Sequence, residues 1–205
     1  AREQPHLIGL QEVSQFLIQS PGDFLAGNPV AAESIALDFL DVLLEATAAI
    51  GQTYVVAAEV ANSDIEFISE TADDLRQIDR EFILARSDVT IVDTQTGHFA
   101  QRVTIPVVGE TVIEIPRGWA LVDVMIEDRP LRFVSAHLEV NAYHDIQINQ
   151  SEELARGIPQ TSSETILAGD INSRPVRTVA TSYATIWDAG YLDTWMEVKS
   201  EPGPT

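Results

Sequence analysis

Short apolar runs bounded by polar or turn residues recur along the chain and predict buried β-strands. Three such runs stand apart from one another, at residues 6–13 (HLIGLQEV), 53–60 (TYVVAAEV) and 162–171 (SSETILAGDI). Five more follow in quick order at residues 80–92, 98–108, 110–115, 119–127 and 131–140, with hairpin turns predicted at Gly109-Glu110 and Asp128-Arg129-Pro130. So many strands in so short a stretch predict an antiparallel or mixed sheet.

Helical spacing of apolar residues alternates with these strands. After Asn28-Pro29, positions such as Ile35, Phe39 and Leu43 recur on one helical face, which predicts a helix that ends at Gly51. Residues 144–157 and 176–190 predict two further helices, residues 61–79 an acidic connection with weak helical character, and residues 191–198 an irregular or extended tail. Strand clusters separated by helices predict two β-sheets packed face to face with helices outside.

The composition fits one globular domain and makes one class of partner unfavourable. The chain has 205 residues, of which 45% are hydrophobic, enough for one sizeable core. Asp and Glu number 32 against 12 Lys and Arg, so the formal net charge is -20. Such a surface repels polyanions and disfavours non-specific binding to duplex DNA, whereas small phosphorylated substrates and metal ions remain compatible with it.

Other features narrow the chemistry and leave the compartment open. The chain has no cysteine, so we expect no disulfide partner, no thiolate metal site and no cysteine nucleophile. Its apolar runs fall short of the roughly 18 residues of a membrane span, and residues 1–10 lack the order of a signal peptide, so we expect a soluble chain. Secreted and periplasmic locations agree with this composition, which does not select among compartments.

Three predicted strands end in polar groups that could share one site. They are IGLQEV with Glu12, VSAHLEV with His137, and ILAGDINS with Asp170 and Asn172. Carboxylates such as Glu12 and Asp170 suit Mg²⁺, which keeps several waters and binds through one or two carboxylates plus substrate phosphate. A histidine can donate to a phosphoryl oxygen as charge develops there, and an amide can hold a phosphate oxygen or a water.

Each of these residues also has a structural interpretation. Glu12 could cap a loop at the end of a strand, and His137 could be a hydrogen-bonded core histidine. Asp170 and Asn172 could form an Asx-type turn whose side chains bond to their own backbone. Their occurrence together and in this order favours the site.

These motifs resemble those of a known superfamily. IGLQEV, SAHLEV and LAGDINSRP are similar to successive motifs of the endonuclease/exonuclease/phosphatase superfamily, which includes DNase I-like nucleases, abasic-site endonucleases, inositol polyphosphate 5-phosphatases and neutral sphingomyelinases. The last motif is usually Gly-Asp-Phe-Asn and is Gly-Asp-Ile-Asn here. The resemblance runs from about residue 6 to residue 196. It implies an α/β (α+β) fold, the DNase I-like four-layer sandwich of two packed mixed β-sheets flanked by helices.

The resemblance implies a role for each matching residue. Glu12 matches the metal-binding glutamate, and Asp170 and Asn172 match the pair that orients the attacking water and contacts the phosphate. His137 matches the histidine at the phosphoryl oxygens. Asp79 matches an acid that orients that histidine in DNase-like members, although a cap is an equal alternative. The cofactor implied is Mg²⁺, with Mn²⁺ and Ca²⁺ as alternatives.

For three further polar residues we expect a structural role in preference to a functional one. Arg117 is at the start of a predicted strand, and we expect it to form a surface ion pair instead of contacting substrate phosphate. Asn141 and His144 follow SAHLEV, and we expect them to be loop residues, with contact to the substrate as the second interpretation.

The resemblance is interrupted at both ends. The superfamily has an Asn-bearing strand before the first motif and a closing Ser-Asp-His after the last, and neither is present, nor do His6 and Asp193 replace them by context. We therefore expect one domain over residues 1–205, incomplete at both ends, with a truncated natural protein as the alternative. The leading hypothesis is a metal-dependent phosphoesterase acting on a small-molecule, lipid-headgroup or nucleic-acid ester. The alternatives are a DNase-like nuclease and a non-catalytic binding module.

Overall fold

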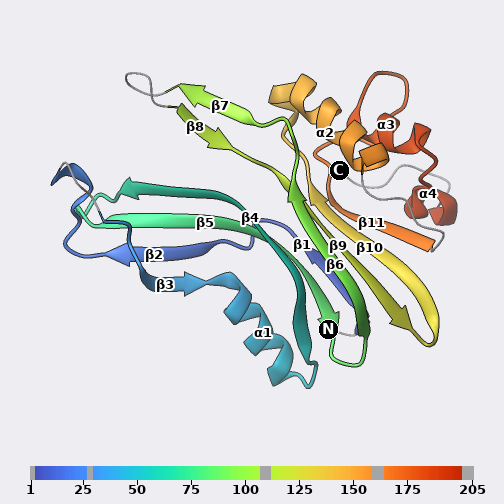
Figure 1. The fold of residues 1–205 in the computed structure, drawn as a ribbon, viewed down its shortest axis with the longest axis horizontal. Coiled ribbons are helices and arrows are strands. Elements are labelled where there is room, and N and C mark those ends of the chain that lie inside the picture. Colours follow the sequence, from blue (N-terminus) through green and yellow to red (C-terminus); the bar gives the residue numbers. More distant parts are fainter. Residues whose placement is uncertain (1–2, 27–29, 107–111, 158–163, 200–205) are drawn as a thin grey trace.

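The computed structural model describes residues 3–26, 30–106, 112–157 and 164–199. Within these ranges two β-sheets pack face to face, and helices cover their outer faces (Figure 1). Five described strands form the first sheet, in which β4 pairs with one edge of β5, β1 and β2 pair with different parts of its other edge, and β3 pairs with β2. Its strands are β1 (Leu7–Leu10), β2 (Gln15–Gln19), β3 (Ser34–Asp38), β4 (Tyr54–Ile68) and β5 (Asp74–Arg86).

Four described strands form the second sheet, in the order β11, β10, β9, β6. β10 and β11 run parallel, whereas β9 pairs antiparallel with both β10 and β6, so the predicted mixed sheet is confirmed. A separate antiparallel ribbon consists of β7 and β8. These strands are β6 (Thr90–His98), β7 (Val103–Pro106), β8 (Val112–Ile115), β9 (Gly118–Ile126), β10 (Arg129–His137) and β11 (Glu164–Asp170).

Buried apolar clusters hold the layers together. Successive residues of β5 point to opposite faces of the first sheet, so Phe82 packs toward α1 while Ile83 packs between the two sheets. On the outer face of the second sheet, Leu154 of α2 and Ile186 of α3 complete another cluster. The result is the predicted four-layer sandwich. Its helices are α1 (Phe39–Ala49), α2 (His144–Gly157), α3 (Ser182–Asp188) and α4 (Thr194–Lys199), with single 3-10 turns η1 (Phe24–Ala26) and η2 (Asn141–Tyr143).

The predicted helix before Gly51 is wrong over its first part. Residues 34–38 form β3, which pairs with β2, and α1 begins only at Phe39. Asp38 is the N-cap, because its side chain accepts a hydrogen bond of 2.9 Å from the Leu40 N–H. Apolar residues at Ile35 and Leu37 fitted the helical spacing but also fit the alternation of a strand, and pairing with β2 decides between the two.

The expected acidic connection at residues 61–79 is also a strand pair. β4 continues to Ile68 and β5 begins at Asp74, so the two form a long hairpin. Charged residues on its outer part meet opposite charges, as where Arg76 donates to Asp64, and this pairing makes an acidic segment compatible with strands. The sequence pattern did not predict β2 (Gln15–Gln19).

Smaller differences concern turns and the end of the chain. A turn lies near the predicted Asp128-Arg129-Pro130, but it consists of Glu127 and Asp128, both with positive φ (49° and 63°), as in a type I′ hairpin, and Arg129 and Pro130 already belong to β10. Residues 194–199 form α4 instead of an irregular tail, because Asp193 accepts hydrogen bonds from the first free N–H groups of the helix. The predicted turn at Gly109-Glu110 and the tail at residues 200–205 lie outside the described residues.

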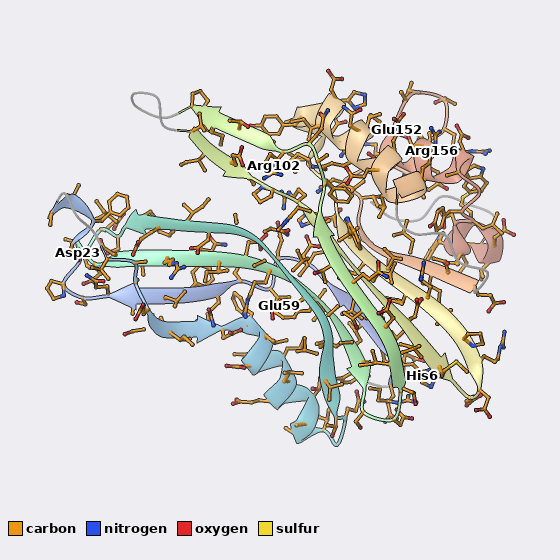
Figure 2. The ribbon with its side chains drawn as sticks, in the orientation of Figure 1. His6, Asp23, Glu59, Arg102, Glu152 and Arg156 are labelled. Atoms are coloured by element: carbon orange, nitrogen blue, oxygen red, sulfur yellow. The ribbon has the colours of Figure 1, made fainter. Side chains whose placement is uncertain are left out.

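The described helices are too short or too polar to cross a membrane. Figure 2 shows Asp23 at the far end of the first sheet and His6 near the opposite end. His6 and the candidate site are at different ends of β1, because His6 precedes the strand and Glu12 follows it.

Candidate functional site

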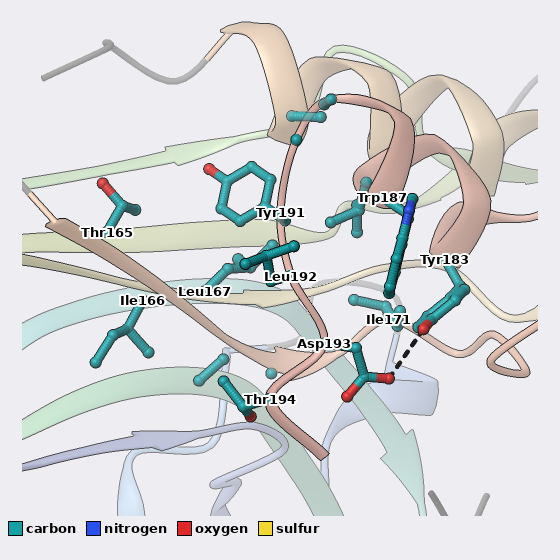
Figure 3. Close-up of a pocket in the computed structure, with 16 residues that line it drawn as sticks. Thr165, Ile166, Leu167, Ile171, Tyr183, Trp187, Tyr191, Leu192, Asp193 and Thr194 are labelled. Atoms are coloured by element: carbon teal, nitrogen blue, oxygen red, sulfur yellow. Dashed lines mark hydrogen bonds between the residues drawn. The ribbon is translucent and has the colours of Figure 1, made fainter. Parts of the chain in front are cut away.

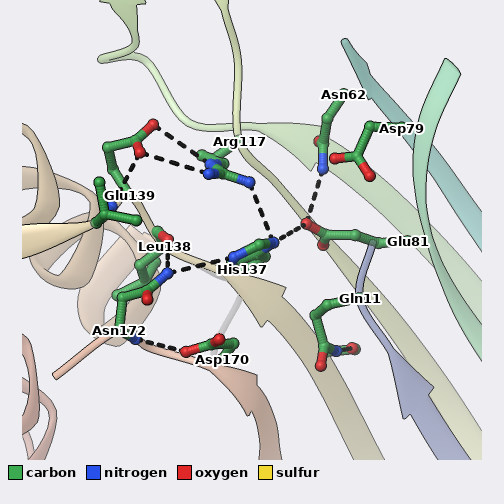
Figure 4. A network of polar contacts seen from close by, with 12 residues as sticks. Gln11, Asn62, Asp79, Glu81, Arg117, His137, Leu138, Glu139, Asp170 and Asn172 are labelled. Carbon is green, nitrogen blue, oxygen red and sulfur yellow. Dashed lines mark hydrogen bonds and ion pairs between the residues drawn. The ribbon is translucent and has the colours of Figure 1, made fainter. Parts of the chain in front are cut away.

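Parallel pairing of β10 with β11 brings two of the predicted residues together. His137 and Asp170 are register partners at the last paired position of these strands. The backbone N–H of Leu138 then donates to the Asp170 carbonyl at 2.9 Å, which continues the pairing by one step. Figure 4 shows these residues beside Asn172, as the order of motifs in the sequence predicts.

Asn172 is both a turn residue and a neighbour of His137. Its backbone has φ +48° and its N–H donates to Asp170 Oδ1 at 2.8 Å, so the predicted Asx-type turn is present. The same turn directs the Asn172 side chain toward β10, where Nδ2 donates to the Leu138 carbonyl at 2.9 Å and lies 3.3 Å from His137 Nε2. The predicted turn is therefore what brings the Asn172 amide next to His137.

His137 is almost fully buried between polar partners. Arg117 Nη1 lies 3.2 Å from His137 Nδ1, and a guanidinium group can only donate, so Nδ1 accepts and the neutral ring carries its proton on Nε2. Burial, followed by the charge of Arg117, lowers the pKa of His137 below its ordinary value and favours this neutral ring. An N–H donor of His137 thus faces the amide of Asn172.

Arg117 is held in place by a buried acid. Its Nε and Nη2 lie 3.3 and 3.4 Å from the carboxylate of Glu139, which has only 4% of its side chain exposed. The expected surface ion pair is therefore wrong in its location, because the pair is buried next to His137. Glu139 was not singled out from the sequence, although it belongs to the SAHLEV motif.

Glu81 is a second site residue that the sequence did not reveal. It is fully buried, and its Oε1 lies 3.6 Å from His137 Nδ1 and accepts a hydrogen bond of 2.7 Å from Asn62 Nδ2. Burial raises its pKa to about 8. Its Oε2 and the Asn62 Oδ1 have no hydrogen-bond partner. A glutamate inside the apolar strand REFILAR was a signal for this site, because a carboxyl group is rarely buried without a specific partner.

Asp79, the acid expected to orient His137, lies two residues away on the same face of β5. Its Oδ1 is 3.5 Å from Ser14 Oγ, and the Asp79 side chain does not contact the His137 ring. Burial raises its pKa, while the positive charge of Arg117 opposes this shift. The described acid that contacts the ring is Glu81.

Glu12 and Asp170 provide exposed carboxylates in the neighbourhood of His137. Glu12 follows β1 in a left-handed conformation (φ +57°), which is unfavourable for a non-glycine residue and is often found at functional sites. Its negative charge contributes to the raised pKa values of Asp79 and Glu81, so it lies within electrostatic reach of both. Glu12 and Asp170 both favour the protonated form of His137, which places both near the ring.

Glu12 and Asp170 are the residues that could hold a cation at this site. The described residues contain no group of three or more His, Asp and Glu side chains placed to hold a metal. Glu12 and Asp170 together supply at most two carboxylates, a number typical of protein ligands for Mg²⁺.

A cavity lies apart from these residues. A hollow of about 710 Å³ runs along the outer edge of β11, which has no strand partner among the described residues (Figure 3). Its walls are mainly apolar, and Tyr183 Oη donates to Asp193 Oδ2 at 2.9 Å at one end. None of the predicted site residues lines it. Asp193 is therefore a helix cap in the wall of this hollow.

The remaining candidate residues are peripheral. Asn141 opens the short turn η2 and His144 is the first residue of α2. No contact joins either side chain to His137 or Asn172, so the structure supports their interpretation as residues of the connection after β10.

Comparisons with solved structures identify the fold. The structure of an endonuclease/exonuclease/phosphatase family protein from Leptotrichia buccalis matches 95% of this chain and 64% of its own, with 20% sequence identity and a TM-score of 0.61. Humanized TDP2 from D. rerio (16% identity, TM-score 0.53) and D. rerio TDP2 complexed with single strand DNA product (15%, 0.53) each match 98% of this chain.

The chain spans 61% and 60% of those two TDP2 chains. No protein-family model and no curated protein matches the sequence. The chain therefore has the fold of the endonuclease/exonuclease/phosphatase proteins, the DNase I-like sandwich expected from its motifs, and it spans less than two thirds of the length of these neighbours.

Proposed function

We propose that this site hydrolyses phosphate esters with the help of a divalent metal ion. The observation that supports the proposal is the 3.3 Å approach of Asn172 Nδ2 to His137 Nε2. With the His137 proton on Nε2, two N–H donors lie side by side, and one phosphoryl oxygen could accept from both. Such donors stabilise the negative charge that develops on phosphoryl oxygens in the transition state.

The neighbouring residues hold His137 and Asn172 in this orientation. Arg117, fixed by Glu139, supplies the donor that holds His137 in the required tautomer, and its charge attracts an anionic ester. Asp170 is exposed beside Asn172, where its carboxylate can accept hydrogen bonds from an attacking water. Direct attack by water requires no covalent protein intermediate.

Glu12 and Asp170 are the residues proposed to hold the metal. When bound, a divalent ion would polarise the phosphoryl oxygen and stabilise the leaving group. Mg²⁺ is the first candidate, and Mn²⁺ and Ca²⁺ have the same preference for oxygen ligands.

The proposal is tested by hydrolysis of bis-p-nitrophenyl phosphate and p-nitrophenyl phosphate by the full chain. We expect release of p-nitrophenol with Mg²⁺ or Mn²⁺ that stops with EDTA and returns when metal is added in excess. Circular dichroism in the same buffers confirms that the protein stays folded. Equal rates with metal and EDTA would contradict the metal dependence.

Folded protein that hydrolyses neither ester with any of the three metals would contradict the proposed activity of this chain. It would favour the alternative of a binding module. The rate ratio between the two esters separates the diester from the monoester as substrate.

A further inference from the structure

The first sheet extends beyond the second sheet as an arm, which consists of β2, β3, residues 64–68 of β4 and residues 74–78 of β5 (Figure 1). One face of the arm carries charged side chains, two of which accept hydrogen bonds from the backbone at Asp23 and Ala32. There Asp74 Oδ2 accepts from the Asp23 N–H at 2.6 Å, and Glu66 Oε1 accepts from the Ala32 N–H at 2.8 Å.

The opposite face of the arm is apolar. Antiparallel register places Ser34, Ile18, Leu75 and Phe67 in one cross-strand row, and a second row contains Leu37, Phe16, Gln77 and Ile65. The two rows contain no charged residue. We call the apolar members of both rows the platform: Phe16, Ile18, Leu37, Ile65, Phe67 and Leu75.

The platform is open in the described part of the chain. Leu37 and Phe67 are 39% and 41% exposed, and the other four are partly buried. None of the six belongs to, or packs against, the three buried clusters of the core. Contiguous exposed apolar surface on a soluble protein often marks an interaction site.

The platform continues directly into the candidate site. Alternate residues of β5 point to one face, so Leu75 and Gln77 are followed by Asp79 and Glu81. At about 3.3 Å per residue, Leu75 is about 13 Å from Asp79 along the strand. Gln77 Nε2 donates to Ser14 Oγ at 3.0 Å, and that hydroxyl lies 3.5 Å from Asp79, so hydrogen bonds join the two regions.

We infer that the platform binds the apolar chain of an amphiphilic phosphate ester while its phosphate lies at His137 and Asn172. This inference rests on the proposed function, because it names the substrate class for that site. A single amphiphile carries one phosphate group, so it suits a protein of net charge -20 better than an anionic polymer or an anionic lipid surface. The apolar face and the adjacent polar cluster match the two ends of such a molecule.

The test compares methyl, butyl and octyl phosphate by isothermal titration calorimetry in EDTA, so that no ester is hydrolysed, each below the concentration at which octyl phosphate forms micelles. Partial burial of the chain should strengthen binding about twofold per methylene, or about 10²-fold from methyl to octyl phosphate. Leu37→Ser should reduce that ratio and leave binding of methyl phosphate unchanged.

The matched control is Leu192→Ser, because Leu192 is 67% exposed and lines the hollow beside β11 instead of the platform. This variant should keep the full octyl-to-methyl ratio. Equal binding of methyl and octyl phosphate would overturn the inference. A ratio lost in Leu192→Ser and kept in Leu37→Ser would also overturn it, since the alkyl chain would then occupy the hollow.

The experiments distinguish a failure of the phosphoesterase proposal from a failure of the platform inference. Hydrolysis of bis-p-nitrophenyl phosphate without any effect of alkyl chain length would sustain the phosphoesterase and overturn the platform. Binding that depends on chain length and on Leu37, in a folded protein that hydrolyses no ester, would sustain the platform and contradict the phosphoesterase.

Discussion

Glu81 and His137 are buried side by side, and burial acts on the two in opposite directions. Each group favours its neutral form away from water, so the pKa of Glu81 is raised to about 8 and that of His137 is lowered. A protonated carboxyl and a neutral imidazole can remain 3.6 Å apart without any buried net charge. We therefore expect this pair to be neutral at neutral pH.

This pair predicts a pH dependence of the free energy of unfolding. An acid whose pKa is raised by folding adds stability that is complete below its unfolded value of 4.5 and disappears as pH rises through about 8. His137 acts in the other direction, because its lowered pKa removes stability only as pH falls below its ordinary value of 6.5. Above neutral pH, only Glu81 of the two should contribute.

Urea unfolding in EDTA should show that the free energy of unfolding of the wild type falls by about 1 kcal/mol between about pH 7 and about pH 9. Glu81→Gln should not show this decrease. The matched control Glu114→Gln changes an exposed glutamate on β8 and should keep the wild-type slope. Identical slopes for the wild type and Glu81→Gln would show that Glu81 is already ionised at neutral pH.

At the scale of elements, the close approach of β10 and β11 determines where the site residues lie. Gly169 has φ +139°, and a Cβ atom at this position would lie 2.0 Å from the Ala136 carbonyl oxygen. Only glycine fits both the conformation and the contact. The Gly in the LAGDINSRP motif thus allows Asp170 and Asn172 to reach His137.

Gly169→Ala should destabilise the protein by at least about 1–3 kcal/mol, because strain and a backbone clash add together. Gly51→Ala is the matched control, since Gly51 also has positive φ (+77°) but nothing within 4 Å of a new Cβ. Thermal unfolding of both variants measures the difference. A loss in Gly169→Ala no larger than in Gly51→Ala would contradict the close approach.

The sequence predicted those elements whose pattern has a single interpretation. The apolar run before Asp170 and the helix at residues 144–157 were located correctly. Residues 34–38 were not, because Ile35 and Leu37 fit both a helix and a strand until β2 is known to pair with them. The arm could not be predicted either, because its charged residues are matched by partners distant in the sequence.

The same limit applies to the site. Asn172 and His137 were found from their motifs, and the structure places them together. Glu81 was overlooked within an apolar strand, and its role depends on Asn62 and His137, which are 19 and 56 positions away. Which acid contacts the ring is decided by how β4, β5 and β10 pack, and local sequence does not contain this information.

At the scale of the whole molecule, the net charge of -20 predicts how activity responds to salt. A small ester makes few ionic contacts, so its kcat/KM should change by less than about tenfold between about 50 and about 200 mM NaCl. A substrate held through six or more nucleic-acid phosphates should lose about 10³-fold over that range. Steep salt dependence with single-stranded DNA, together with faster cleavage of it than of the small ester, would contradict the small-substrate proposal.

The central claim is that His137 and Asn172 together stabilise a phosphoryl oxygen. The most direct test is the kcat for bis-p-nitrophenyl phosphate of His137→Gln and of Asn172→Ala, with saturating Mn²⁺. His6→Gln and Asn149→Ala serve as matched controls outside the site, and circular dichroism verifies folding. Loss of a transition-state donor predicts a decrease of about 10²–10³-fold in each site variant and unchanged rates in the controls. Folded site variants that turn over at the wild-type rate would contradict the account.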